Sequence, residues 1–258
     1  MLAIIGGSGL TTLSNMEVSR REVVRTPYGE PSGVLTFGRI CQEETVFLAR
    51  HGYAHTIPPH AVNYRANIWA LHNAGVKGII SVASVGGIRG DLRPGDIVLP
   101  NQIIDYTWGR ASTFFDGVDN PVTHIDFTEP YDQPLTARIV AAAANAGVTL
   151  KAGAVYAATQ GPRLETAAEI NRLERDGADV VGMTGMPEAA LARELNIPYA
   201  AINVIANYAA GRADSVHGIS FDSIEEVLQG AMGRVRQIIE QLVGCSDSCQ
   251  VAETLVSK

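Results

Sequence analysis

The chain has 258 residues, of which 46% are hydrophobic and 18% are charged, so it is long enough to bury one sizeable core. Its formal net charge is −7 and no run is rich in Lys or Arg, which argues against a nucleic-acid partner. No apolar run approaches the roughly 20 residues of a membrane span, and no basic leader precedes the first strand. Because only three cysteines occur, we expect reduced thiols and a cytoplasmic location.

Short β-branched runs alternate with amphipathic segments along the chain. The runs at 2–5, 34–37, 45–49, 78–82, 96–100, 154–158, 177–181 and 199–206 predict strands. The apolar spacing at 62–74, 135–146, 166–175, 187–195 and 223–242 predicts helices. This alternation predicts a single α/β domain over residues 1–243, with a mixed or largely parallel sheet. Residues 244–258 lack a regular apolar stripe, so we expect a disordered tail there.

Two glycine-rich turns follow predicted strands. In Gly6-Gly7-Ser8-Gly9, a dinucleotide fingerprint would need a third glycine where Thr12 stands, and the polar segment 11–25 shows no helical face. Backbone N–H groups and the Ser8 hydroxyl could instead cradle one phosphate, and a purely structural turn is a further alternative. The strand at 82–87 also runs into glycines, which lets its backbone approach a ligand or merely pack into a turn.

Polar donors follow two other strands. Arg50 and His51 end one strand, where a guanidinium fork and a ring N–H could hold an oxyanion. His55 and His60 come next, but they lack the carboxylate or Cys partners of a zinc site, so we expect no metal and allow a plain loop role. The segment 182–184 leads from a strand into a helix and ends on Thr184, whose hydroxyl could bind an anion or only cap the helix.

Six short motifs acquire a specific meaning when they are taken together. They are Gly-Gly-Ser-Gly (6–9), Arg-His-Gly (50–52), Val-Asn-Tyr-Arg-Ala-Asn (62–67), Pro-Gly-Asp-Ile-Val (94–98), Gly-Pro-Arg-Leu-Glu-Thr (161–166) and Gly-Met-Thr-Gly-Met-Pro-Glu (182–188). On these motifs the chain, over residues 3–242, resembles the trimeric-type purine nucleoside phosphorylase and methylthioadenosine phosphorylase family. The resemblance implies a distorted mixed central β-sheet flanked by helices and a homotrimer with active sites near the subunit interface. It also implies phosphorolysis of a nucleoside, with orthophosphate as co-substrate and no cofactor.

Matching positions imply a role for each candidate site residue. The implied phosphate ligands are Ser8, Arg50, His51, Ala83, Ser84 and Thr184. Several family members carry a hydroxyl residue at the position of Ala83, so its share falls to the backbone. The implied substrate contacts are Glu165, Met183 under the ribose, Asn207, Tyr208, Ala209, Phe221 and, lent by the neighbouring subunit to the 5′ end of the sugar, His124. Asn207 is the implied catalytic residue, because it would stabilise the purine as the base gains negative charge.

The base-site residues favour a 6-oxopurine. The adenine-specific branch of the family carries Asp-x-Asp where this chain has Asn207 and Ala209. An amide can donate to N7 and O6 of hypoxanthine, and Glu165 can accept the N1–H that adenine lacks. Because adenine N1 is itself an acceptor, an ionised Glu165 would repel it, and a buried mismatch of this kind can discriminate by about 10⁴.

The 5′ end of the sugar leaves three residues open. Ile219 or Phe221 would suit a methylthio group, whereas His217 would suit a hydroxyl. A 6-oxo base with an apolar 5′ pocket predicts S-methyl-5′-thioinosine as the substrate. The alternatives are S-methyl-5′-thioadenosine and inosine or guanosine. A non-enzymatic dinucleotide-binding protein is a fourth, but it would leave Arg50 and Glu165 without a task.

Overall fold

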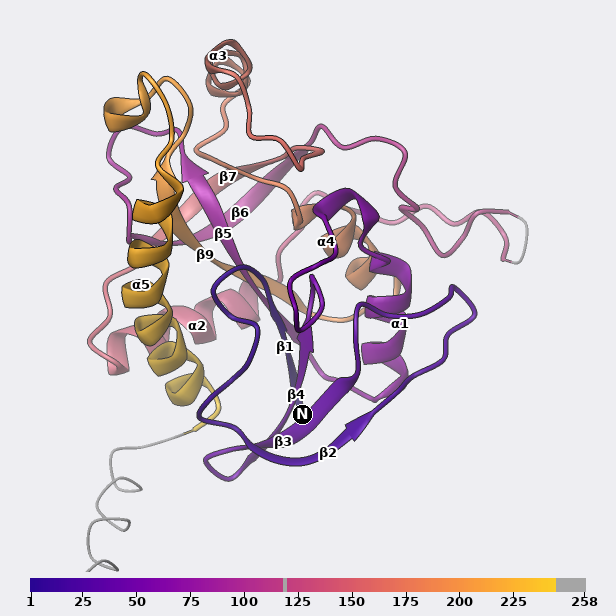
Figure 1. Cartoon of the computed structure of the whole chain (residues 1–258). Coiled ribbons are helices and arrows are strands. Elements are labelled where there is room, and N and C mark those ends of the chain that lie inside the picture. The colour runs from indigo at the N-terminus through magenta and orange to yellow at the C-terminus, as the bar shows by residue number, and fades with distance from the viewer. Residues whose placement is uncertain (118–119, 245–258) are drawn as a thin grey trace, which may run out of the picture.

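The computed structural model describes residues 1–117 and 120–244, and its strands form one mixed sheet (Figure 1). The strands are β1 (Leu2–Gly6), β2 (Glu17–Glu22), β3 (Leu35–Ile40), β4 (Glu43–Ala49), β5 (Ile79–Gly87), β6 (Ile97–Asp105), β7 (Lys151–Ala158), β8 (Val180–Gly182) and β9 (Tyr199–Tyr208). The helices are α1 (Tyr64–Asn73), α2 (Gln133–Asn145), α3 (Ala167–Arg175), α4 (Gly185–Glu194) and α5 (Phe221–Leu242), with 3₁₀ turns at Pro59–Ala61 and Ala213–Ser215. The predicted single α/β fold with a mixed sheet is confirmed.

The sheet has an open part and a closed part. Its order is β2-β3-β4-β1-β5-β8-β7-β6-β9, and β9 pairs with β5 as well as with β6. Strands β5, β8, β7, β6 and β9 therefore close into a ring, while β1, β4, β3 and β2 extend from β5 as an open wing. Strand β1 is parallel to β4 and β5, and β5 is parallel to β9. This closure of five strands into a ring is the form that the expected distortion of the sheet takes.

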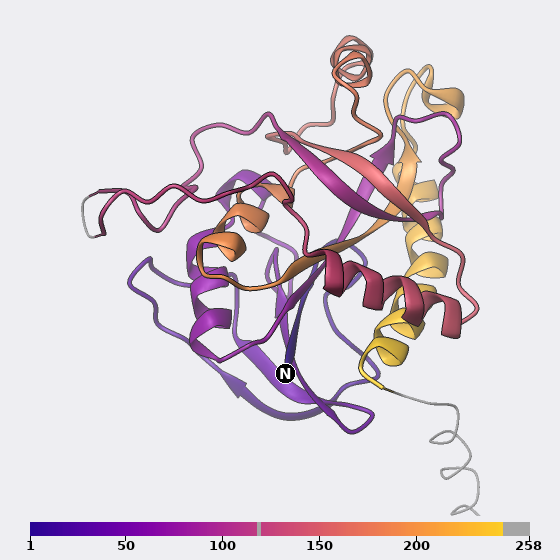
Figure 2. The ribbon, with the colours of Figure 1, turned by 180° about the vertical axis from the view of Figure 1, so that it is seen from behind.

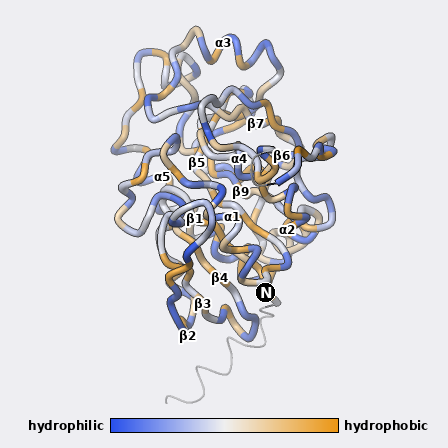
Figure 3. The backbone as a smooth tube through the Cα atoms, turned by 90° about the vertical axis from the view of Figure 1, so that its right-hand side faces the viewer, coloured by the Kyte–Doolittle hydropathy of each residue, from blue (hydrophilic) through white to orange (hydrophobic). Residues whose placement is uncertain are grey.

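Helices cover both faces of the sheet (Figures 1 and 2). Helices α2 and α5 pack on one face, over a core that includes Ile139 and Val235 together with residues of β1 and β9. Helices α1 and α4 cover the other face, over a core that includes Ile68 and Leu191. In Figure 3 the central strands carry the hydrophobic colour, and the outer turns are hydrophilic. This is the pattern expected when the central strands are buried on both faces.

Polar caps set where the predicted helices begin. The Asn63 side chain accepts from the backbone N–H of residue 66 and starts α1, and Asp132 starts α2 in the same way. Thr166 and Glu169 form a reciprocal capping box at the start of α3. Each of these three capped helices begins within two residues of the start that its apolar spacing predicted.

Three features depart from the sequence-based expectations. Strand β2 was not predicted, because every residue in it is exposed and it has no apolar face to mark it. Strands β6 and β9 run past their predicted ends, and the extension of β9 includes Asn207 of the candidate site. Cys41 is disulfide-bonded, in contrast to the expected reduced thiols. The predicted tail, apart from Gly244, lies outside the described residues, within which no helix is long and apolar enough to cross a membrane.

Candidate active site

The ends of four neighbouring strands bring the candidate residues together. Because β1, β4, β5 and β9 are mutually parallel neighbours, their carboxyl ends meet at one edge of the sheet, where ligands bind in open α/β folds. Ser8 follows β1, Arg50 and His51 follow β4, Ser84 lies in β5, and Asn207 lies near the end of β9. All five line a single cavity of about 560 Å³.

Nearly all of the predicted site residues line this cavity. The predicted phosphate ligands are all among them, and so are the substrate residues Glu165, Met183, Asn207, Ala209 and Phe221. The two exceptions are Tyr208 and His124. The geometry thus gathers residues from seven separate segments of the chain, although their individual roles stay predictions.

Tyr208 does not line the cavity. Its backbone carbonyl instead accepts a hydrogen bond from Asn207 Nδ2 at 2.6 Å. In the single chain Tyr208 thus supports Asn207, and its role as a substrate contact stays a prediction.

His124 is exposed and lies outside the cavity of its own chain. It belongs to the segment between β6 and α2, which extends away from the body of the molecule in both views (Figures 1 and 2). A single chain thus leaves His124 without a role in its own cavity, and its contribution to a neighbouring subunit stays a prediction.

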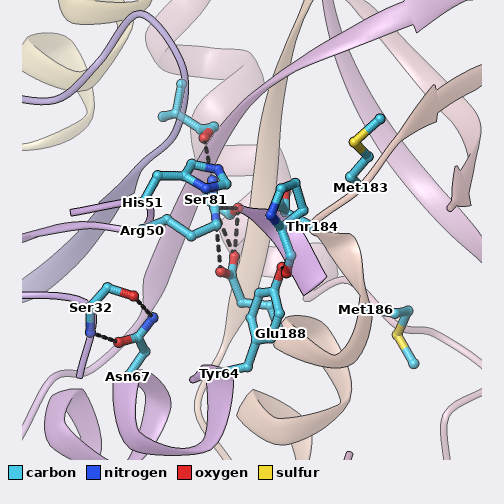
Figure 4. A network of polar contacts seen from close by, with 12 residues as sticks. Ser32, Arg50, His51, Tyr64, Asn67, Ser81, Met183, Thr184, Met186 and Glu188 are labelled. Carbon is cyan, nitrogen blue, oxygen red and sulfur yellow. Dashed lines mark hydrogen bonds and ion pairs between the residues drawn. The ribbon is translucent and has the colours of Figure 1, made fainter. Parts of the chain in front are cut away.

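Arg50 is held by a fully buried network (Figure 4). Its Nε and Nη2 donate to the two carboxylate oxygens of Glu188 at 2.7 and 2.9 Å. Nη2 also donates to Ser81 Oγ at 2.6 Å, and Nη1 donates to the Val82 carbonyl at 3.1 Å. Four of the five guanidinium N–H groups are thereby used. The planar fork holds Glu188 rather than the phosphate, which corrects the predicted geometry and leaves one Nη1–H for an anion.

Glu188 is the main functional residue that sequence reasoning missed. Both its side chain and that of Arg50 are 0% exposed. Its carboxylate also accepts from Ser81 Oγ and from the Tyr199 hydroxyl, each at 2.8 Å. Burial is the largest single influence on the pKa of Arg50 and lowers it, but the charge and hydrogen bonds of Glu188, together with nearby tyrosines, raise the pKa by more in sum, so the guanidinium stays charged. The available signal was the acidic end of the motif at 182–188, just where a helix begins.

The ring N–H of His51 is used within the protein and is not free to donate to an anion. Nδ1 lies 2.8 Å from the Ile57 carbonyl, which can only accept, so Nδ1 is the protonated nitrogen. Burial, followed by the charge of Arg50, lowers the pKa of His51 to about 4. The neutral ring then has its lone pair on Nε2, and His51 is an acceptor at neutral pH rather than the predicted ring N–H donor.

His55 lies in the site, although the sequence offered only a plain loop role for it. It lines the cavity, and its Nε2 lies 3.4 Å from Ser8 Oγ. Its ring centroid is 4.8 Å from that of His51. His60 does not line the cavity. Among residues 1–117 and 120–244, no group of three or more His, Cys, Asp or Glu side chains is placed to hold a metal ion.

Thr184 is available to an anion. It is buried at the position before α4, yet its side chain makes no capping hydrogen bond, so the alternative role as a helix cap is not supported. Its backbone N–H donates to the hydroxyl of Tyr156 at 3.3 Å. The Thr184 hydroxyl thus lines the cavity beside Met183, as expected for a residue that binds phosphate next to a ribose platform.

Two segments that carry predicted base and sugar contacts, Glu165 and Met183, meet closely beside the cavity. Thr159 Oγ1 donates to Glu165 Oε1 at 2.7 Å, which orients the carboxylate. Gly161 has φ +62°, and a Cβ there would lie 2.4 Å from the sulfur of Met183. On the other side, one residue of β9 is left out of its register with β5 just before Asn207. Such irregularities re-aim side chains next to active sites.

One group of the side chains that line the cavity is apolar. It consists of Ile219, Phe221, Ile224 and Leu228, the last three from α5. His217 is exposed and does not line the cavity. Phe221 is 70% exposed in the single chain, so this part of the lining is open to solvent. Of the three candidates for the contact with the 5′ group, Ile219 and Phe221 thus line the cavity and His217 does not.

Comparison with known proteins places this geometry in context. Residues 1–244 match the family model described as "Phosphorylase superfamily". The chain is 50% identical to the probable S-methyl-5′-thioinosine phosphorylase of Pseudomonas syringae pv. tomato, over 95% of this chain and 98% of that protein. It is 43% identical to the 6-oxopurine nucleoside phosphorylase of Pyrococcus furiosus, over 97% and 98%. Methylthioadenosine phosphorylase from Schistosoma mansoni, solved with adenine, superposes with a TM-score of 0.89 at 31% identity, over 98% and 95%.

Proposed function

Because the chain belongs to the phosphorylase superfamily, as an enzyme of the purine nucleoside phosphorylase type, we propose that its substrate is S-methyl-5′-thioinosine. Orthophosphate would cleave this nucleoside to hypoxanthine and 5-methylthioribose 1-phosphate. The observation that carries the proposal is that one cavity is lined both by a carboxylate, Glu165, and by a group of apolar side chains that includes Ile219 and Phe221. A 6-oxo base and a methylthio group are the chemical complements of these two features.

The 5′ pocket favours a thioether over a hydroxyl. Ile219 and Phe221 offer only carbon to a ligand, and His217 lies outside the cavity. Burying a hydroxyl there without a hydrogen-bond partner is unfavourable, whereas a methylthio group gains from the apolar contact. This argument favours methylthioinosine over inosine.

The base end favours hypoxanthine over adenine. Thr159 donates to one oxygen of Glu165, and the other oxygen can accept N1–H of a 6-oxopurine. Asn207 can donate from its second amide hydrogen to N7 or O6, since the first is directed to the Tyr208 carbonyl. Adenine would present an acceptor to Glu165 and an amino donor towards the Asn207 amide.

The mechanism follows from charge and proton balance. The C1′–N9 bond breaks with both electrons going to the purine, and a phosphate oxygen forms the new bond to C1′. Hydrogen phosphate enters as a dianion with one proton, and the sugar 1-phosphate leaves as a dianion without it. The proton therefore ends on the released base. Asn207 would stabilise the purine as negative charge builds on it, and removal of one such donor typically costs about 10²–10³ in rate.

The phosphate end of the cavity supplies both donors and an acceptor. The remaining Nη1–H of Arg50 and the hydroxyls of Ser8 and Thr184 can donate to phosphate oxygens. Neutral His51, with its lone pair on Nε2, can accept a hydrogen bond from the phosphate oxygen that bears the proton. We include in the proposal that the enzyme acts as a homotrimer in the cytoplasm, with His124 completing the neighbouring site.

The test is phosphate-dependent kcat/KM for methylthioinosine, methylthioadenosine and inosine in parallel. We expect methylthioinosine to lead both others by at least about a hundredfold. Methylthioadenosine in the lead would refute the role of Glu165 and Asn207 as the base filter. Inosine in the lead would refute the apolar 5′ pocket, and no phosphate-dependent cleavage would refute the phosphorylase assignment.

A pair of variants tests the 5′ pocket separately. Ile219→Asn places an amide in the cavity and should narrow the preference for methylthioinosine over inosine about tenfold or more. Val216→Asn is the matched control, because Val216 is an exposed apolar residue outside the cavity, and it should leave the preference unchanged. Equal effects of the two variants would contradict the assignment of Ile219 to the 5′ end.

A further inference from the structure

We propose that Arg110 is a positioning residue that locks the ribose platform to the base-reading segment, and that it thereby sets the rate of the reaction. This inference rests on the proposed function, because it assigns Arg110 to the same cavity. Arg110 lies between β6 and α2, is half-buried and does not line the cavity. It carried no role in any of the sequence motifs.

The guanidinium of Arg110 binds two chain segments at once. Nη1 donates to the carbonyls of Met183 at 2.8 Å and Met186 at 2.6 Å. Nη2 donates to the carbonyls of Gln160 at 2.9 Å and Thr159 at 3.2 Å. Nε reaches the side-chain oxygen of Gln160 at 3.3 Å. One side chain therefore joins the segment after β7 to the segment after β8.

The acceptors of Arg110 are all neutral. Besides the carbonyls it has a hydrogen bond at 3.4 Å and a cation–π contact at 5.4 Å with Tyr64. Within residues 1–117 and 120–244 no ion pair involves Arg110. A cation held in this way stabilises the arrangement of the carbonyl dipoles around it. The position of the guanidinium is then set by the backbone carbonyls and not by a carboxylate partner. This points to a role in backbone geometry.

Arg110 connects the two segments just beyond the point where β7 and β8 stop pairing. Strands β7 and β8 are paired in parallel up to Ala158 and Gly182, and beyond these residues the two segments leave the sheet. The carbonyls that converge on Arg110 come directly after those ends. Five planar N–H groups suit this task, whereas a lysine ammonium could not span both segments in one fixed geometry.

Both clamped segments carry residues of the cavity. Met183 and Thr184 belong to one, and Glu165 follows Thr159 and Gln160 in the other. The two segments touch where the backbone of Gly161 passes Met183. In the view of Figure 4, Met183 and Met186 lie on the far side of Thr184 from Arg50. Arg110 thus fixes the base acceptor relative to the sugar floor, and a misplacement of about 1 Å in such a geometry can cost about 10² in rate.

The test separates positioning from folding. In Arg110→Ala we expect kcat for methylthioinosine to fall about a hundredfold, while KM for phosphate changes less than about threefold. Millimolar methylguanidinium should restore at least a tenth of the lost rate with saturation, and methylammonium should not. Arg110→Lys should keep the melting temperature yet lose at least about tenfold in kcat, because it keeps the charge without the fork.

Arg234→Gln is the matched control. Arg234 also donates to a backbone carbonyl, that of Gly95, but both residues lie outside the cavity. It should leave kcat unchanged.

The outcomes of this test are distinct from those of the proposed function. If the wild-type enzyme cleaves none of the nucleosides, the proposed function fails. If the wild type is active and a folded Arg110→Lys retains kcat within threefold, the inference about Arg110 is overturned. The inference is also overturned if folded Arg110→Ala gains nothing from methylguanidinium. Should Arg110→Ala fail to fold, the result for Arg110→Lys decides alone.

Discussion

The buried pair between Arg50 and Glu188 should be essential for stability as well as for the phosphate site. In Glu188→Gln the shape of the side chain is kept, but the negative charge is removed from a site that is 0% exposed. The carboxylate accepts four hydrogen bonds, two from Arg50 and one each from Ser81 and Tyr199. The amide NH₂ of a glutamine would face donors at one of these two oxygen positions.

The expected loss follows from the charge left behind. Breaking a buried pair by removing one partner typically costs about 3–5 kcal/mol, because the other charge stays buried and uncompensated. For a domain of this size we therefore expect the melting temperature to fall by roughly 6–20 °C. Urea unfolding at a fixed protein concentration measures the free energy directly, since the stability of an oligomer depends on concentration.

A double variant checks the cause. Arg50→Leu combined with Glu188→Leu removes both charges, and apolar replacement of a buried pair is often neutral or stabilising. We expect the double variant to be more stable than Glu188→Gln and yet inactive with phosphate. A free energy of unfolding for Glu188→Gln within about 1 kcal/mol of the wild type would refute the reasoning.

Three further outcomes follow from the site. Since the pKa of His51 is lowered to about 4 from about 6.5, the native state binds fewer protons than the unfolded state between these pH values. Acidification from pH 6.5 to 4 should therefore cost about 3 kcal/mol of unfolding free energy that His51→Asn does not lose, as acid titrations of both proteins would reveal. Thr159→Val should lower kcat/KM for methylthioinosine about ten- to a hundredfold by releasing Glu165, and Thr159→Ser should restore it. Gly182→Ala should lower the unfolding free energy by about 1–3 kcal/mol in a urea titration, because the added Cβ would lie 2.2 Å from the Tyr156 hydroxyl.

Much of the fold follows from patterns that the chain displays locally. Caps such as Thr166 and stops such as Gly75 bound the helices, and β-branched runs mark the buried strands. Strand β2 escaped prediction because an exposed strand has no apolar alternation. The second pairing of β9 could not be predicted either, because it depends on the register between β5 and β9 along their full length.

In the site, too, some properties could be predicted from the sequence and others could not. Motifs and spacing predicted which side chains meet in the cavity, but not which of their atoms are already engaged. The fork of Arg50 is committed to Glu188, and the N–H of His51 is committed to the Ile57 carbonyl. These bonds join residues far apart or on turning loops, and no local pattern encodes them. Arg110 escaped for a related reason, since its acceptors are backbone carbonyls without a sequence signature.

The closed ring of strands bears on how far apart the two reactants are held in the cavity. The nucleophile would be held largely by residues that follow β1 and β4 in the open wing, with Thr184 contributed by the ring, whereas the sugar and the base would be held by ring residues that lie after β7 and β8 or within β9. Strand β5 is the one strand that belongs to both, and Ala83 and Ser84 lie on it. The distance between the phosphate oxygen and C1′ therefore depends on the shared strand. Any movement of the open wing relative to the ring would lengthen or shorten this distance.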